Sequence, residues 1–367
     1  MPGIDPGRAC REVSFDILPG ASKYCARAAG FVDFCQMSYP NELGGFIPRL
    51  ESLRGLAALS VLGFHAYGNR HDTNVGGMAP VVLFFVLSGF VLARSLDRNA
   101  DPLNFFRNRV FRLFPAAAAS VFLLTVLYWQ FDFYIGFPTS HDWTNIILNA
   151  LMIRSDINGV MWSLTVECVA SPLIFASFLA RKAYGNRPLI VVCAILFGLS
   201  FWGDYVHLLG GFTSLAPLYS FVVGVALHFA AKDAKSPSYV LGATTVGLAV
   251  LLFCGLRKHN ALTILGDTIG SGALIYLIAT AKNSRVFFLL DARPVRFLGK
   301  ISFSFYLLHP IALGLANRSG AESALALFIL AAAYTFPMAW ISWREIECRF
   351  IDLRRRFRSS TTVRATG

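Results

Sequence analysis

The feature that most constrains this chain is a series of about ten apolar stretches, each long enough to cross a lipid bilayer. The hydrocarbon core of a bilayer is about 30 Å thick, so a spanning helix needs about 20 mainly apolar residues. Hydrophobic residues make up 55% of the chain and charged residues only 15%, which excludes an ordinary soluble domain. We therefore predict an all-α integral membrane protein with about ten transmembrane helices in one bundle. The predicted helices cover approximately residues 52–68, 78–96, 113–131, 162–180, 188–205, 212–231, 239–256, 262–281, 301–317 and 322–342.

The basic residues between these stretches predict how the chain is oriented. The formal net charge is +12, and most Lys and Arg fall in alternate connections and at both ends. Cytoplasmic loops carry an excess of Lys and Arg, so both termini are predicted to be cytoplasmic in the cell (inner or plasma) membrane. Because topology accounts for the positive charge, nucleic acid is not expected as a partner. The opposite side keeps only Arg70, Arg154, Arg257, Lys258 and Arg318.

Composition divides the chain into three regions. Residues 1–46 lack the uninterrupted apolar core of a signal peptide and are expected to form an amino-terminal cytoplasmic extension. Residues 47–353 form the membrane domain, and residues 354–367 form a basic cytoplasmic tail. The seven cysteines have neither paired nor metal-ligand spacing, so we expect free thiols and no metal site.

The first apolar stretch carries two ionisable residues, Arg54 and His65. Eleven residues at about 100° each bring them to one helical face, about 16 Å apart along the axis. An ionisable group within a span usually lines a cavity or pathway, which makes both residues functional candidates. A basic flank at Arg54 and a histidine packed against a neighbouring helix would produce the same sequence.

A basic cluster with Arg107, Arg109 and Arg112 precedes the third stretch. Arg109 and Arg112 are three residues apart, so their guanidinium groups share a helical face and can converge on phosphate oxygens. A cytoplasmic flank also requires basic residues, so a phosphate site and a topology signal are both open. Ser88 in the second stretch is similarly consistent with a cavity or with close helix packing.

The segment Trp162-Ser-Leu-Thr-Val-Glu167 contains a carboxylate inside an apolar stretch. Such a group requires a partner or a wet cavity, and Ser163 lies on the same helical face four residues earlier. The predicted orientation puts Glu167 and His65 in the outer half of the bilayer, where they could meet. Glu167 would then fix the tautomer of His65 for general-base catalysis. A hydrogen bond from Glu167 to a neighbouring helix is the alternative.

The ninth stretch carries a polar stripe formed by Ser302, Tyr306 and His309, spaced by four and three residues. A polar stripe on an apolar helix indicates either a lined cavity or an internal hydrogen-bond network.

Together these motifs resemble the membrane acyltransferase 3 family. The resemblance covers about residues 46–353, and its motifs occur in the family's order. Arg349 stands where the family usually has proline. The motifs are Arg54 with ten residues before His65, Phe84-Phe-Val-Leu-Ser-Gly-Phe90, Arg109-Val-Phe-Arg112-Leu-Phe-Pro115, Trp162-Ser-Leu-Thr-Val-Glu167 and Phe305-Tyr-Leu-Leu-His-Pro310.

This resemblance implies an O-acyltransferase that moves an acyl group, often acetyl, from cytoplasmic acyl-coenzyme A to a hydroxyl group. The implied acceptor is a surface glycan, a lipid-linked sugar or a similar molecule, and no permanently bound cofactor is expected. His65 would be the catalytic histidine, Arg54 its partner and Glu167 the helper carboxylate. Arg109 and Arg112, with Arg107 beside them, would contact coenzyme A phosphates. The expected substrate cavity is lined by Ser88, Trp162, Ser163, Ser302, Tyr306 and His309.

A proton-coupled transporter or exporter is the main alternative function, because His65 and Glu167 could also form a proton relay. A scaffold that binds lipid or glycan without catalysis is a second alternative. The arginine pair opposite a buried histidine favours an enzyme, and the sequence has no internal repeat of the kind common in secondary transporters.

Overall fold

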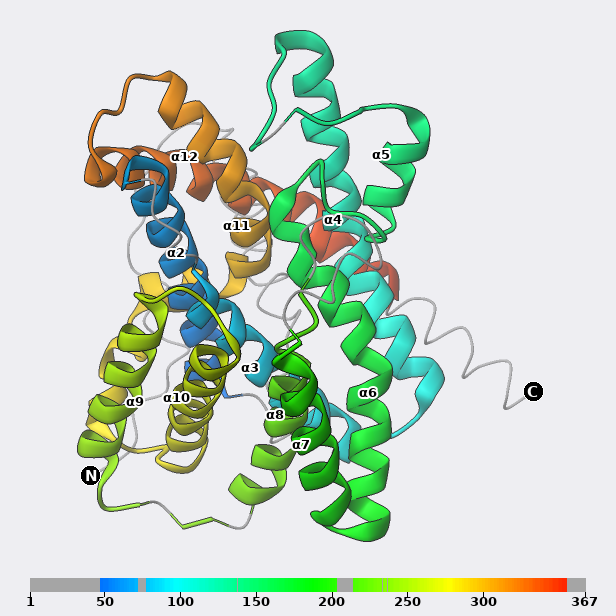
Figure 1. The fold of residues 1–367 in the computed structure, drawn as a ribbon, viewed down its shortest axis with the longest axis vertical. Helices are drawn as coiled ribbons and strands as arrows, with labels where there is room; N and C mark the ends of the chain where they lie inside the picture. Colours follow the sequence, from blue (N-terminus) through cyan, green and yellow to red (C-terminus); the bar gives the residue numbers. More distant parts are fainter. Residues whose placement is uncertain are drawn as a thin grey trace, which may run out of the picture. The chain divides into compact units, whose positions relative to one another are not determined.

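All regular structure in the described part of the chain is helical, as predicted (Figure 1). The structure is a computed structural model that describes residues 47–71, 77–136, 138–202, 214–232, 234–235 and 237–354. The predicted amino-terminal extension and the tail beyond residue 354 lie outside these residues. The helices are α2 (Pro48–His71), α3 (Met78–Arg98), α4 (Pro102–Phe131), α5 (Trp143–Ala150), α6 (Trp162–Tyr184), α7 (Arg187–Ser200), α8 (Leu218–Lys232), α9 (Val240–Gly255), α10 (Ala261–Thr280), α11 (Arg293–Arg318) and α12 (Ala324–Ser342).

Three short segments connect or extend these helices. A 3₁₀-helix, η1 (Gly159–Met161), leads into α6, and a second, η2 (Arg285–Asp291), precedes α11. A π-helical turn, η3 (Trp343–Glu347), continues α12.

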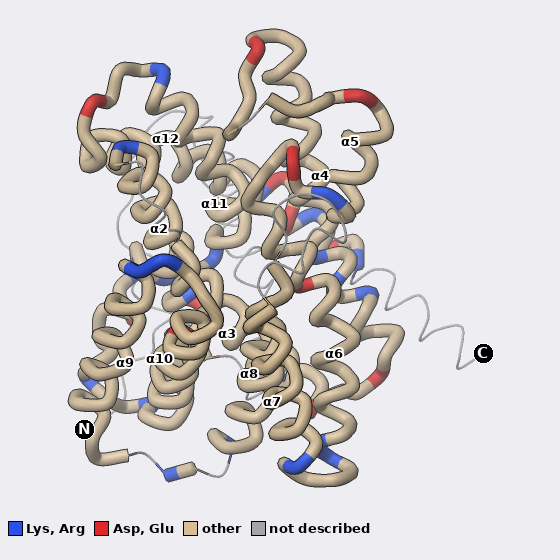
Figure 2. Tube along the Cα trace, in the orientation of Figure 1, with Lys and Arg blue, Asp and Glu red and all other residues tan. Residues whose placement is uncertain are grey.

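The apolar composition accounts for a helical membrane protein, and helix length limits which helices can be counted as crossings. Each of the ten predicted stretches contains a helix. Six of these, in α3, α4, α6, α10, α11 and α12, are long and apolar enough to cross a bilayer. The apolar helices α7, α8 and α9 have only 14, 15 and 16 residues. Figure 2 shows long uncharged stretches along the helices, with most charged residues near helix ends and in connections. Ten crossings therefore stay a prediction.

Local sequence signals explain where several helices begin. The side chain of Asp101 accepts a hydrogen bond from the backbone N–H of Asn104, and Pro102 occupies the first turn of α4. At the start of α10, Asn260 accepts from the backbone N–H of Thr263, whose hydroxyl accepts from Asn260 in return. These caps satisfy N–H groups that have no partner within the helix.

Helices α2 and α11 form the pair on which the candidate site is built. A Cβ atom added to Gly55 would lie 2.6 Å from the backbone nitrogen of Gly299, and one added to Gly299 would lie 2.5 Å from the backbone oxygen of Glu51. Only residues without a side chain allow the two backbones to approach this closely. Ten residues further along each helix, His65 contacts His309. The two helices are therefore parallel and in register over this length.

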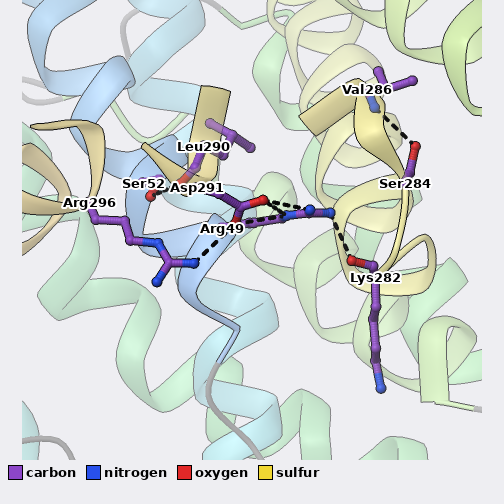
Figure 3. Close-up of polar contacts among 8 residues, drawn as sticks. All are labelled: Arg49, Ser52, Lys282, Ser284, Val286, Leu290, Asp291 and Arg296. Atoms are coloured by element: carbon purple, nitrogen blue, oxygen red, sulfur yellow. Dashed lines mark hydrogen bonds and ion pairs between the residues drawn. The ribbon is translucent and has the colours of Figure 1, made fainter. Parts of the chain in front are cut away.

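A polar cluster holds the start of α2 against η2 (Figure 3). Arg49 forms an ion pair with Asp291 at 2.6 Å and donates a hydrogen bond to the carbonyl of Lys282 at 2.9 Å. Arg296 also pairs with Asp291, and Ser52 donates to the carbonyl of Leu290 at 2.6 Å. Hydrogen bonds from Arg49 lower the pKa of Asp291 from its ordinary value, so the carboxylate stays charged at neutral pH. The cluster ties α2 to the segment that leads directly into α11.

The glycine contact predicts a difference in stability between two alanine variants. Gly299→Ala should lower the free energy of unfolding by about 1–3 kcal/mol, because its methyl group overlaps the backbone of α2. Gly198→Ala in α7 is the control, since its Cβ would have no atom within 4 Å. Alanine is the better helix former there and should preserve or raise stability. Thermal unfolding in detergent measures both, and equal melting temperatures would contradict this account of the contact.

Candidate active site

The two histidines predicted on separate spans form a directly bonded pair. Nδ1 of His65 lies 2.9 Å from Nε2 of His309, and the two rings stack with centroids 5.1 Å apart. Nδ1 of His309 lies 2.6 Å from the backbone carbonyl oxygen of Tyr306. His309 is completely buried, whereas His65 is partly exposed.

This chain of contacts defines the tautomer of each ring. A carbonyl oxygen can only accept, so Nδ1 of His309 carries a hydrogen and donates to Tyr306. In a neutral ring, Nε2 of His309 is then an acceptor, and Nδ1 of His65 donates to it. The remaining nitrogen of His65, Nε2, has no hydrogen and keeps its lone pair. The pair therefore presents a base of fixed orientation.

A cavity lies among α2, α3, α4, α6 and α11. Apolar side chains, including Phe84, Phe85 and Phe303, form much of its wall. Mixed apolar walls with a few convergent polar groups are typical of small-molecule sites. The structure thus brings eight of the predicted site residues onto one surface. These polar lining residues are Arg54, Ser88, Arg109, Arg112, Ser163, Glu167, Ser302 and Tyr306.

One wall of the cavity contains a buried ion pair between Arg109 and Glu167. Their closest charged atoms are 2.6 Å apart, and each side chain is at most 15% exposed. Ser88 donates a hydrogen bond to the same carboxylate at 2.9 Å, and Arg109 donates to Ser171 at 3.3 Å. The predicted contact between Glu167 and His65 is not formed in the described part of the chain. Glu167 instead pairs with Arg109.

The hydroxyl groups of Tyr306 and Ser163 also line the cavity. The phenol of Tyr306 donates to the carbonyl of Val160 at 3.0 Å and lies 2.9 Å from the hydroxyl of Ser163. The ring of Tyr306 meets the edge of Phe84, with centroids 5.8 Å apart. It is 6% exposed and is therefore held in one position between η1, α6 and α3.

Comparison with known proteins places these observations in a family. The profile of a family described as an acyltransferase domain, of the acyltransferase 3 type, matches residues 47–344. The chain belongs to the acyltransferase 3 family. No solved structure matches it significantly.

Three relatives illustrate the breadth of the acyltransferase 3 similarity. The O-acetyltransferase OatA of Staphylococcus aureus is 25% identical over 348 residues, covering 82% of this chain and 57% of OatA. A putative peptidoglycan O-acetyltransferase, YrhL of Bacillus subtilis, is 38% identical over 24% of this chain and 14% of its own length. A putative acetyltransferase of Acidianus two-tailed virus, ORF330, is 30% identical over 33% of this chain and 37% of its own. The chain thus spans little more than half the length of OatA.

Four other predicted site residues do not line the cavity. His65 and His309 form the pair beyond it. Arg107 donates to Asn104 one turn earlier on α4. Trp162 packs edge-on against Phe85, with ring centroids 6.1 Å apart.

The pairing of His65 with His309 was missed at the sequence level, although a signal was present. Gly55 precedes His65 by ten residues, and Gly299 precedes His309 by the same number. A small residue at a helix contact followed by a polar residue at equal spacing on two spans predicts a parallel pair with facing side chains. Groups of three or more metal-ligating side chains are absent from the described residues.

The buried ion pair predicts a non-additive effect on stability. Arg109→Met or Glu167→Gln alone should cost about 3–5 kcal/mol, because each leaves a buried charge without its partner. The double variant removes both charges and should be more stable than the sum of the single effects implies. Thermal unfolding of the four proteins in detergent measures the coupling. Strictly additive changes would show that the two charges do not depend on each other.

Proposed function

We propose that this protein is a membrane O-acyltransferase that moves an acyl group, acetyl in the first instance, from cytoplasmic acyl-coenzyme A to a hydroxyl group. The observation that carries the proposal is the unprotonated Nε2 of His65, whose orientation is fixed through His309. Membership of the acyltransferase 3 family and the similarity to OatA support the reaction class.

The proposed reaction uses His65 as a general base. Nε2 accepts the proton of the acceptor hydroxyl as its oxygen attacks the thioester carbonyl carbon. A carbon–oxygen bond forms, the carbon–sulfur bond breaks, and the coenzyme A thiolate takes up the proton from the imidazolium. The hydrogen bond from His65 to His309 persists when His65 becomes charged, so the ring stays aligned through the step.

Arg54 and Arg112 are the residues that we propose for the coenzyme A phosphates. Both line the cavity, and guanidinium groups suit bidentate phosphate contacts. Arg109 lines the same cavity and pairs with Glu167. In this proposal the chain crosses the membrane ten times, with both termini in the cytoplasm. The nucleotide of coenzyme A would stay at the cytoplasmic face. Its pantetheine arm would then pass along the cavity towards the histidines.

The acceptor that we propose is a glycan or lipid-linked sugar on the far side of the membrane. The names of OatA and YrhL describe O-acetyltransferases, and that of YrhL specifies peptidoglycan. His65 is partly exposed and lies eleven residues along α2 from Arg54, which suits an acceptor that approaches from the opposite side to the donor.

A proton-coupled transporter is less well supported. That function would use His65 and Glu167 as a relay, but His65 bonds to His309 while Glu167 bonds to Arg109 and Ser88. Purified protein distinguishes the two functions, because only an enzyme transfers or hydrolyses labelled acetyl from acetyl-coenzyme A.

Replacement of His65 tests the proposed base. His65→Ala should lower acetyl transfer by about 10²- to 10⁴-fold while the protein stays folded. His309→Ala should cause a smaller loss, because it removes the group that orients His65 and leaves the base itself. His71→Ala, near the end of α2 and bonded to neither histidine, is the control. Unchanged transfer by His65→Ala, measured with labelled acetyl-coenzyme A, would refute the assignment.

Replacement of Arg112 tests the proposed donor site. Arg112→Ala should raise the apparent KM for acyl-coenzyme A more than it lowers kcat, since it removes a charge that acts in binding. Arg107→Ala is the matched control from the same helix, because Arg107 bonds to Asn104 and does not line the cavity. A KM for Arg112→Ala equal to that of the unmodified protein would leave Arg112 without a role in donor binding.

A further inference from the structure

The hydroxyl groups along the cavity differ in what they bond to. Ser88 donates to Glu167, and Tyr306 donates to the carbonyl of Val160. Ser163 is within hydrogen-bond distance of both Val160 and Tyr306. Ser302 also lines the cavity, yet its hydroxyl has no hydrogen-bond partner among the described residues.

Ser302 does not bond to the backbone of its own helix. A serine or threonine inside a helix commonly bonds back to a carbonyl in the preceding turn. In this protein Ser60, Thr125, Ser171 and Thr280 all do so. Ser302 is only 2% exposed, and it lines the cavity. Its hydroxyl is available to a molecule inside the cavity.

Ser302 also lies in line with the histidine pair. It precedes His309 by seven residues on α11, which returns to the same helical face about 10 Å nearer the arginine end. Helical side chains lean towards the amino terminus, so the imidazoles of this parallel pair lean towards the level of Ser302. The reacting groups would lie in series: the serine hydroxyl, the thioester carbonyl, the acceptor oxygen and the imidazole nitrogen. This series spans about 8 Å, including a hydrogen bond of about 2.8 Å at each end. The separation between Ser302 and the histidine pair therefore allows Ser302 to contact the thioester carbonyl oxygen while His65 contacts the acceptor oxygen.

We propose that Ser302 is a catalytic residue that donates a hydrogen bond to the carbonyl oxygen of the acyl thioester. As the acceptor oxygen bonds to the carbonyl carbon, the carbonyl electron pair moves onto oxygen, and the Ser302 hydroxyl stabilises that negative charge. When the charge returns to re-form the carbonyl, the carbon–sulfur bond breaks and the thiolate takes the proton from His65. Tyr306 and Ser163 stay bonded to Val160 and hold the wall beside this position. The inference rests on the proposed acyl transfer.

Kinetics give the first test. Ser302→Ala should lower kcat for acetyl transfer by about 10²- to 10³-fold with little change in the KM for acetyl-coenzyme A. Ser302→Thr keeps a hydroxyl and should recover part of the rate. Ser60→Ala, a serine on the exposed face of α2, is the control and should transfer at the normal rate. A normal kcat for Ser302→Ala would overturn the inference while leaving the proposed function intact.

Infrared spectroscopy of the bound donor separates this inference from the proposed function. In the His65→Ala background, acetyl-coenzyme A labelled with ¹³C at the carbonyl should show a stretching band lowered by the hydrogen bond. Adding Ser302→Ala should shift the band to higher frequency. A protein-bound band that does not respond to Ser302→Ala would exclude the hydrogen bond from Ser302 to the carbonyl and leave the donor site intact. No protein-bound band in any variant would overturn both the donor site and the role of Ser302.

Discussion

The close approach of α2 and α11 at Gly55 and Gly299 is the contact on which the candidate site depends. With no side chain at either position, the two backbones touch and their register is fixed. That register determines that His65 faces His309 ten residues later, at hydrogen-bond distance. The Arg49–Asp291 pair ties α2 to η2, the segment that leads into α11. The glycine contact therefore determines the position of the histidine pair ten residues further along the two helices.

The charges along the cavity are arranged so that part of the positive charge is used within the protein. Arg109 is paired with Glu167, which in turn receives a hydrogen bond from Ser88. A buried ion pair is tolerated only when both charges are compensated in this way. It joins α4, α6 and α3 and gives the cavity wall a rigid polar segment. Arg54 and Arg112 line the same cavity from α2 and α4.

The sequence predicted the helical class and many of the residues around the cavity. It did not predict which of these residues bond to one another. Periodicity identifies which face of a helix is polar, and so Ser302, Tyr306 and His309 could be assigned to one stripe. It does not specify which stripe another helix presents opposite, because that depends on packing geometry. Glu167 was therefore assigned to His65 from predicted depth, although a closer cation at Arg109 neutralises it. The number of crossings was likewise inferred from apolar length, and α7 to α9 are short for that inference.

Helix α11 connects the steps from packing to chemistry along a single face. Gly299 sets its contact with α2, Ser302 lines the cavity, and His309 orients His65. Because these residues share one rigid helix, their separations along the axis are fixed by helical geometry and do not depend on loops. Acyl transfer requires reacting groups to be held to within about 0.5 Å, a tolerance that helices meet more readily than connections do. A change in the helix contact would move the base relative to the donor even though every reacting group was still present.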